Sequence, residues 1–179
     1  MRKFFVLAAL LVFVSGVAMA QDHPKAEVFA GYSFLRVNPG QSVSGENFAG
    51  GWHASLAGNV NNWFGIAGDF SGHYKDIAGV KVKTHTYMAG PRISYRNNEK
   101  VTPFAHVLFG GAHASGGGSS ENAFAVALGG GVDAKINDNF SFRVAQFDYI
   151  LSRFDGPVSL TTANQHNFRI STGIVIRFN

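Results

Sequence analysis

The feature that most constrains the fold of this chain is a two-residue alternation of apolar and polar side chains. Between residues 168 and 178, the even positions read Phe, Ile, Thr, Ile, Ile and Phe, and the odd positions read Arg, Ser, Gly, Val and Arg. The same alternation recurs at 124–133 and at 140–144. Successive side chains of a β-strand point to opposite faces, whereas a helical pattern repeats about every 3.6 residues. The sequence therefore predicts strands with one apolar face, and essentially no helix after residue 20.

The alternation marks eight predicted strands, which cover residues 25–37, 48–59, 62–75, 82–96, 101–114, 122–136, 139–153 and 165–178. A tilted strand needs about 9–11 residues to cross a bilayer, so each of these is long enough. A closed barrel is the only β-structure that pairs all of its backbone polar groups within lipid. We therefore predict an all-β fold, an eight-stranded antiparallel up-and-down transmembrane β-barrel.

The connections between these strands alternate in predicted length. Three are short and rich in asparagine, which tolerates the left-handed backbone of tight turns, and they lie at 59–62, 97–100 and 137–139. The other four are predicted to be longer loops, at 38–47, 75–81, 114–121 and 153–164. The glycine-rich part of the third loop, residues 115–120, is expected to be flexible. Short turns at one end and longer loops at the other are typical of outer-membrane barrels with both termini in the periplasm.

The two faces of the strands distinguish a membrane barrel from a soluble barrel or a sandwich. A soluble barrel has an apolar interior, and a sandwich has an outward face rich in Lys, Glu and Thr. Here the polar face combines small residues with groups that we expect to form a charge network in the lumen, namely His53, Asp69, Arg92, Asp133, Arg143, Asp148, Arg169 and Arg177. Aromatic residues near the strand ends are expected to form interfacial girdles, namely Trp52, Trp63, Tyr74, Tyr87, Tyr95 and Phe178. The pattern favours a membrane barrel.

The tight turns also predict which lumen charges lie opposite each other. If the turn at 137–139 is centred on residue 138, Asp133 lies directly opposite Arg143. If the turn at 59–62 is centred on residue 61, His53 lies directly opposite Asp69. Opposite side chains on one face are close enough for charge-assisted hydrogen bonds. We therefore expect carboxylates and guanidinium groups to pair across the lumen.

One acidic residue does not fit the strict alternation. Counting from Arg143, Asp148 falls on the lipid face, where an unpaired carboxylate is costly. A β-bulge inserts one extra residue and turns the following side chains to the other face. We therefore predict a bulge around 145–147 that returns Asp148 to the lumen.

The first 20 residues have the pattern of a secretory signal peptide. Arg2 and Lys3 form a basic start, residues 4–14 are continuously apolar, and Ala18 and Ala20 supply a small-x-small cleavage signal. The apolar run is too short for a membrane-spanning helix, which needs about 20 residues. The sequence therefore predicts a signal peptide at 1–20 and an exported barrel domain at 21–179, located in the outer membrane.

Several segments resemble motifs of the outer membrane protein β-barrel domain family, the OmpA-like small barrels. They are residues 27–36, Gly51 with Trp52, 68–70, 89–92, 102–106, and Arg143 with 146–149. The resemblance implies an eight-stranded barrel in the outer membrane of a Gram-negative bacterium. The last strand, with its aromatic Phe178, is similar to the signal that the outer-membrane insertion machinery reads.

Composition excludes several other classes of protein. Hydrophobic residues make up 46% and charged residues 15%, which excludes intrinsic disorder. The chain has no cysteine, so disulfides, thiolate zinc sites and cysteine nucleophiles are excluded. The net charge is only +4, including Arg2 and Lys3, which does not indicate a nucleic-acid partner. The seven histidines have no metal-binding spacing, so we expect neither a metal nor another cofactor.

Three functions remain for such a barrel. The first is a structural or surface-interaction role with a plugged lumen, whose partners are outer-membrane lipid, the insertion machinery and an extracellular partner bound through the loops. The second is a pore for small solutes. The third is a lipid A-modifying enzyme, such as a deacylase using Ser55, His53 and Asp69. Because the predicted register places the last two inside the lumen, away from lipid, the sequence favours the first, non-enzymatic role.

Overall fold

The computed structural model describes residues 23–38, 45–77, 79–154 and 163–179. The predicted signal peptide lies outside these residues. Every regular element within them is a strand: β1 (Ala26–Val37), β2 (Glu46–Phe48), β3 (Gly50–Asn59), β4 (Phe64–Ile77), β5 (Val80–Ser94), β6 (Val101–Gly116), β7 (Ser119–Lys135), β8 (Phe140–Phe154) and β9 (Ala163–Phe178). In these described parts of the chain, no helix is long and apolar enough to cross a membrane.

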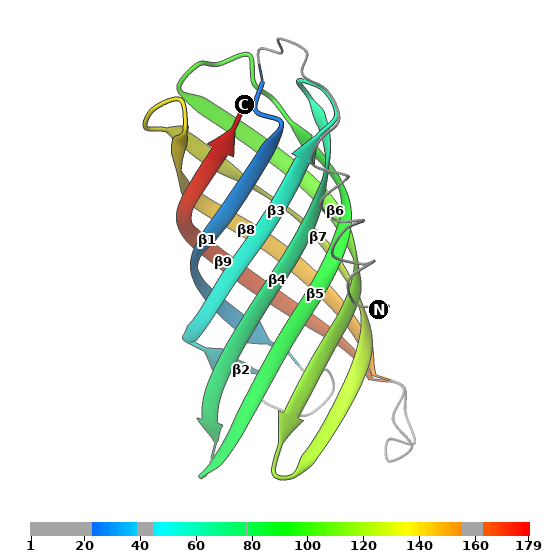
Figure 1. The fold of residues 1–179 in the computed structure, drawn as a ribbon. Helices are drawn as coiled ribbons and strands as arrows, with labels where there is room; N and C mark the ends of the chain where they lie inside the picture. The colour runs from blue at the N-terminus through cyan, green and yellow to red at the C-terminus, as the bar shows by residue number, and fades with distance from the viewer. Residues whose placement is uncertain (1–22, 39–44, 78, 155–162) are drawn as a thin grey trace, which may run out of the picture.

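The strands form one antiparallel sheet that closes on itself (Figure 1). The order is β2-β1-β3-β4-β5-β6-β7-β8-β9, and β1 also pairs with β9 from Ala26↔Phe178 to Arg36↔Phe168. β2 and β3 both pair with β1, at different heights, and only Ala49 separates them in the sequence. They share the second of eight strand positions, so the predicted eight-stranded antiparallel barrel is confirmed.

The three short turns lie at the same end of the barrel as the last residue (Figure 1). We call this the turn end and the opposite end the loop end. Asn61, Asn98 and Asn137 play the same part in the three turns, because each side-chain oxygen accepts hydrogen bonds from the backbone N–H groups two and three residues further on. The donor–acceptor distances range from 2.7 Å for Phe64 to 3.3 Å for Val101. The asparagine-rich turns therefore have a specific side-chain cause.

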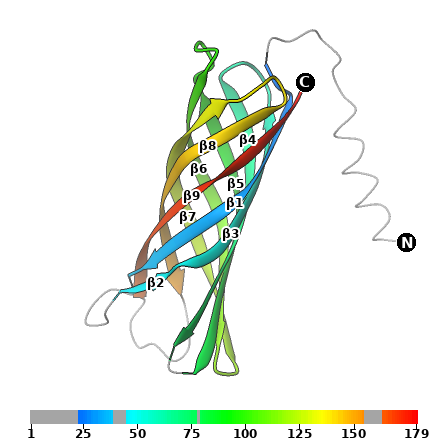
Figure 2. The ribbon, with the colours of Figure 1, turned by 90° about the vertical axis from the view of Figure 1, so that its left-hand side faces the viewer.

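Two of the predicted long loops are instead β-hairpins that continue the strands at the loop end (Figure 2). In the predicted loop 114–121, β6 runs to Gly116 and β7 begins at Ser119. The two residues between them, Gly117 and Gly118, have φ of 59° and 85°, the left-handed backbone that a two-residue hairpin turn needs. In the predicted loop 75–81, β4 runs to Ile77 and β5 begins at Val80. The glycines therefore close a hairpin and do not form a flexible loop.

The predicted bulge is confirmed in β8. Asp133 pairs with Arg143 but Val132 pairs with Ala145, and on the other edge Gly173 pairs with Arg143 while Ser171 pairs with Gln146. The extra residue therefore lies between Arg143 and Gln146, beginning one position before the predicted range. Beyond it the inward and outward positions exchange, and Asp148 is buried in the lumen.

The outer wall of the barrel is apolar along all the long strands. Large apolar side chains such as Leu56, Ile66, Phe109, Leu128 and Phe147 are each at least half exposed. The six aromatic residues predicted for the girdles also lie on this outer surface. Trp63, Tyr95 and Phe178 lie close to the turn end, Trp52 and Tyr74 lie toward the loop end, and Tyr87 lies opposite Phe70, nearer the middle of the wall.

Candidate functional site

The interior of the barrel is crossed by a chain of alternating basic and acidic side chains. Arg169 donates to both carboxylate oxygens of Asp69, at 2.8 and 3.0 Å, and through Nε to Oδ2 of Asp148 at 2.9 Å. Its Nη2 also lies 2.8 Å from the same oxygen of Asp148, as an ion pair. The outer ends of this chain are histidines, with His53 2.6 Å from Asp69 and His106 2.7 Å from Asp148. All five side chains are buried. A single arginine on β9 therefore connects carboxylates from β4 and β8.

A second charge pair stands beside this chain and is linked to it. Arg143 donates to the two carboxylate oxygens of Asp133 at 2.7 and 3.0 Å, and the two residues are direct partners in the sheet, as the turn at 137–139 predicts. Gln146 accepts from Arg143 at 2.7 Å and donates to Asp148 at 2.9 Å. Because the bulge turns Gln146 and Asp148 inward together, it makes this link possible.

The register predicted for His53 and Asp69 is wrong by two residues, although the two side chains do meet. In the sheet His53 pairs with Ser71, and Asp69 pairs with Ser55. Asn61 has the role that Asn137 has in the third turn, so the centre of the first turn is the following residue, 62, as it is 138 in the third. Diagonal neighbours on one face are still within reach of long side chains. The imidazole of His53 therefore still reaches the carboxylate of Asp69.

The turn end of the lumen holds three arginines around one carboxylate that sequence reasoning did not single out. Glu27 lies 3.0 Å from Arg92, 3.3 Å from Arg96 and 3.9 Å from Arg177. Arg92 also reaches Asp133 at 3.4 Å, which joins this group to the Arg143 pair. We call the connected buried groups the lumen network. Alternation could have placed Glu27 in the lumen, because Glu27 and Ser33 are both at odd positions of the same strand and therefore point to the same inward face.

Two aromatic side chains lie inside the barrel, within the lumen network. The guanidinium carbon of Arg143 lies 4.3 Å from the ring centre of Phe29 and 4.4 Å from that of Phe104, and that of Arg92 lies 4.1 Å from Phe104. Cation–π contacts of this kind stabilise desolvated arginines. Neither ring was predicted to point inward, although Phe29 and Phe104 lie on the same faces of their strands as Glu27 and His106.

Apolar side chains fill further parts of the interior. Leu35, Phe48, Met88, Leu108 and Ile150 are buried in one cluster with small alanines. Three of them, Leu35, Phe48 and Ile150, also line a cavity of about 190 Å³ whose walls include Val37, Val82 and Glu121 near the loop end. A second cavity, of about 430 Å³, lies at the turn end and is lined by polar groups that include Arg96, Arg177 and Lys135.

The histidines do not assemble a catalytic or metal site. His53, His73 and His106 point inward, whereas His85 and His166 lie on the outer wall beside Tyr74 and Tyr149. Among the described residues, no group of three or more His, Cys, Asp or Glu side chains could hold a metal ion.

The hydrolase arrangement considered from the sequence is only partly present. His53 contacts Asp69, but no hydrogen bond joins Ser55 to His53 in the part of the chain that the structure describes. The imidazole nitrogen Nδ1 of His53 is buried and has no hydrogen-bond partner there. The pair also lies inside the wall, whereas an acyl chain would have to approach from outside it.

Solved structures of several outer-membrane barrels are similar to this fold. Neisserial surface protein A has a TM-score of 0.71 at 16% identity, over 88% of this chain and 100% of that one. Ail, the attachment invasion locus protein of Yersinia pestis, has 0.58 at 20%, over 87% and 99%. OprG of Pseudomonas aeruginosa has 0.53 at 10%, over 89% and 98%. These likenesses show the fold.

The family comparison covers almost the whole chain. No curated protein sequence matches significantly. The model of the family described as "Outer membrane protein beta-barrel domain" matches residues 5–178. Its span includes every strand of the barrel, and it agrees with the apolar outer wall of the barrel. The chain therefore belongs to the outer membrane protein β-barrel domain family, which implies that it is located in the outer membrane.

Proposed function

We propose that this protein is a closed, non-conducting and non-enzymatic barrel that has a structural and surface-interaction role in the cell envelope. The observation that carries the proposal is the lumen network. Arg143, Arg169, Asp69 and Asp133 are each no more than 1% exposed and hold one another in the middle of the barrel. A path for solutes would have to pass through these groups.

The energetics of the network argue against a pore. An eight-stranded barrel has an interior just wide enough for side chains to fill. Breaking a buried ion pair by withdrawing one partner costs about 3–5 kcal/mol, because the other charge is left uncompensated. Opening this lumen would separate several such pairs at once. A porin-like passage of small solutes is therefore the less favoured function.

The proposed surface role rests on the hairpins at the loop end. In barrels of this kind the short turns face the periplasm and the longer connections face outward. The β4–β5 and β6–β7 hairpins extend beyond the rest of the wall (Figure 2). They would present their tips, around Gly79 and Gly117, to an extracellular partner. The barrel itself would contact outer-membrane lipid through its apolar wall.

Export and assembly complete the proposal. Residues 1–20 would direct secretion as a signal peptide. The insertion machinery would then recognise β9, which pairs with β1 to close the barrel and carries the exposed aromatic Phe178 near its end.

A lipid A-modifying activity is the second candidate, and the geometry favours it less. Its histidine and acid would be His53 and Asp69, which are both 1% exposed and face the lumen. The proposed role requires no catalytic residue, no metal and no other cofactor.

Two measurements on the full-length, folded protein test this function. In liposome swelling, vesicles that contain the protein should swell in small sugars and amino acids no faster than empty vesicles, while a porin control swells. In a strain that lacks the gene, the wild-type chain should restore resistance to detergents. Solute-dependent swelling contradicts the closed lumen, and an envelope that is equally resistant with and without the gene contradicts the structural role.

A further inference from the structure

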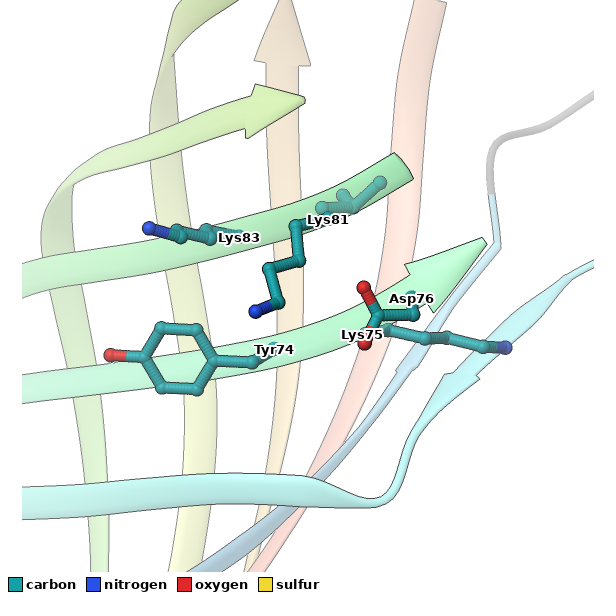
Figure 3. A pocket seen from close by; sticks show the side chains of 6 residues that line it. Tyr74, Lys75, Asp76, Lys81 and Lys83 are labelled. Carbon is teal, nitrogen blue, oxygen red and sulfur yellow. The ribbon is translucent and has the colours of Figure 1, made fainter. Parts of the chain in front are cut away.

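The outer wall of β4 and β5 changes character near the loop end. Between Phe64 and Tyr74 the outward side chains on β4 are apolar or glycine, and the same holds on β5 from Tyr87 to Ile93. Past Tyr74 three outward side chains are charged, Asp76 on β4 and Lys81 and Lys83 on β5. A pocket of about 450 Å³ lies among them (Figure 3).

The height of this pocket coincides with one edge of the apolar wall. Trp63 and Tyr95 mark the wall at the turn end, and Trp52 and Tyr74 mark it at the loop end. The distance along β4 from Phe64 to Tyr74 matches the roughly 9–11 residues that a tilted strand needs to cross a bilayer. Lys83 is the direct sheet partner of Tyr74, and Lys81 is that of Asp76, one step beyond. Both ammonium groups therefore lie at the level of lipid head groups.

These two lysines differ from the neighbouring Lys75 in their contacts. Lys75 points inward and forms an ion pair with Glu46. In the part of the chain that the structure describes, neither Lys81 nor Lys83 forms an ion pair or a hydrogen bond through its ammonium group. Figure 3 shows both ammonium groups on the side of the Tyr74 ring, with the Asp76 carboxylate toward the other end of the pocket. The site therefore offers free positive charge to a ligand.

The neighbouring aromatic groups add donors and a flat surface. The Tyr74 hydroxyl accepts a hydrogen bond from the indole N–H of Trp52 at 3.2 Å and lies 3.3 Å from Nε2 of His85. Rings with polar edges beside two free cations suit a sugar that carries a phosphate. A glycerophospholipid would offer the phosphate without the sugar.

We propose that Lys81 and Lys83, with Tyr74, bind a phosphate of the phosphorylated glycolipid in the outer leaflet, that is, the lipid A part of lipopolysaccharide. The site lies on the outer wall, so it stands whether or not the lumen conducts. It depends on the outer-membrane location that the family implies. It also gives the β4–β5 hairpin a defined height relative to the membrane surface.

The two tryptophans of the chain provide a reporter and its control. In a Trp63→Phe background, Trp52 is the only tryptophan and lies beside the proposed site. The folded full-length barrel, in a zwitterionic detergent, is titrated with purified lipopolysaccharide while Trp52 fluorescence is recorded. In a Trp52→Phe background, Trp63 reports from the opposite end of the wall and should not respond.

The charge dependence is tested with matched double variants. Lys81→Gln with Lys83→Gln should weaken binding by about 20- to 30-fold, because a basic residue at a membrane surface contributes about 1 kcal/mol. Lys81→Arg with Lys83→Arg keeps both charges and should bind within about threefold of wild type. Lys25→Gln with Lys100→Gln removes two exposed lysines at the turn end and should leave binding unchanged.

Titrations with different lipids identify which lipid supplies the phosphate. Dephosphorylated lipid A should bind as weakly to the wild-type chain as intact lipid A binds to the glutamine variant. Equal affinity for phosphatidylglycerol and for lipopolysaccharide would overturn the assignment to a glycolipid. Equal losses of affinity for lipopolysaccharide in the Lys81/Lys83 and Lys25/Lys100 variants, or no loss of affinity in either, would overturn the site itself.

Discussion

At the scale of single residues, Arg169 shows how charge is accommodated in a narrow lumen that side chains fill. It is less than 2% exposed, yet it donates two hydrogen bonds to Asp69 and one to Asp148, and its Nη2 also lies 2.8 Å from Oδ2 of Asp148. Removing such an ion from water costs several kcal/mol, and only well-formed pairing offsets that cost. Each member of the lumen network is therefore tolerable because of its neighbours.

The pair between Asp133 and Arg143 should behave as a unit when it is mutated. Asp133→Ala and Arg143→Ala should each lower the free energy of unfolding by about 3–5 kcal/mol, because each leaves one buried charge without its main partner. The double variant should lose less than the sum of the two. Urea unfolding followed by tryptophan fluorescence, with heat-modified gel mobility as a second probe, measures the loss of unfolding free energy in the two single variants and in the double variant.

An exposed pair in the same hairpin supplies the control for this cycle. Lys135 lies 2.7 Å from Asp138 at the turn, where Asp138 is 82% exposed at its side chain. Substituting either residue by alanine should leave the free energy of unfolding close to that of the wild type, because exposed ion pairs contribute little to stability. Additive losses at Asp133 and Arg143 would show that those two residues are not coupled.

Arg169 and Arg177 should differ sharply in what their loss costs. Arg169→Gln leaves two buried carboxylates without their shared partner, so it should destabilise by at least about 3 kcal/mol. Arg177→Gln removes a contact to Glu27 that is 3.9 Å long, and Glu27 keeps Arg92 at 3.0 Å. It should cost about 1 kcal/mol or less. Midpoints of urea unfolding rank the two variants, and equal midpoints would refute the bridging role of Arg169.

At the scale of strands and turns, period-two patterning carried most of the prediction and local turn chemistry limited it. Lipid outside and charges inside make a one-residue slip costly, so the strand positions and the bulge before Asp148 could be predicted from alternation. The Asp133–Arg143 pairing also required the turn at 137–139 to be centred on residue 138. The register of the first hairpin could not be predicted from alternation, because it depends on which asparagine side chain accepts the backbone hydrogen bonds of the turn. Asn61 accepts the backbone bonds there, so the centre moves to residue 62.

The hairpins at the loop end were missed for a related reason. Glycine clusters are compatible both with flexible loops and with tight turns, and the sequence between 114 and 121 does not separate the two. What decides is whether the flanking residues pair, as Ser115 does with Ser120 and Gly116 with Ser119. The inward aromatics Phe29 and Phe104 were missed because aromatic residues were assigned to the wall by type and not by parity.

The asparagine turns should depend on the side-chain oxygen and not on size. Asn137→Ala removes the acceptor of two backbone N–H groups, at 3.0 and 2.8 Å, and should lower the free energy of unfolding by about 1–2 kcal/mol. Asn137→Asp keeps the acceptor and should cost less than half as much. The same urea unfolding assay compares them, and equal losses for alanine and aspartate would contradict the role of the oxygen.

At the scale of the whole molecule, the barrel differs from a soluble one by having its apolar residues outside and its charges inside. The lumen network fills the centre, apolar side chains extend toward the loop end, and the two cavities lie toward opposite ends of the barrel. That charged side chains occupy the centre could be predicted from eight strands and from the inward charges. The roles of Glu27, Arg96 and Gln146 became clear only from the three-dimensional contacts.

The closed centre is tested most directly by single-channel recording of the purified, refolded full-length protein in planar bilayers. Wild-type protein should insert without giving sustained conductance steps, because the buried side chains of the lumen network occupy the centre of the barrel. Insertion is verified separately by the heat-modified mobility of protein recovered from the same preparation. Sustained, reproducible steps from folded wild-type protein would contradict the closed lumen and favour a pore.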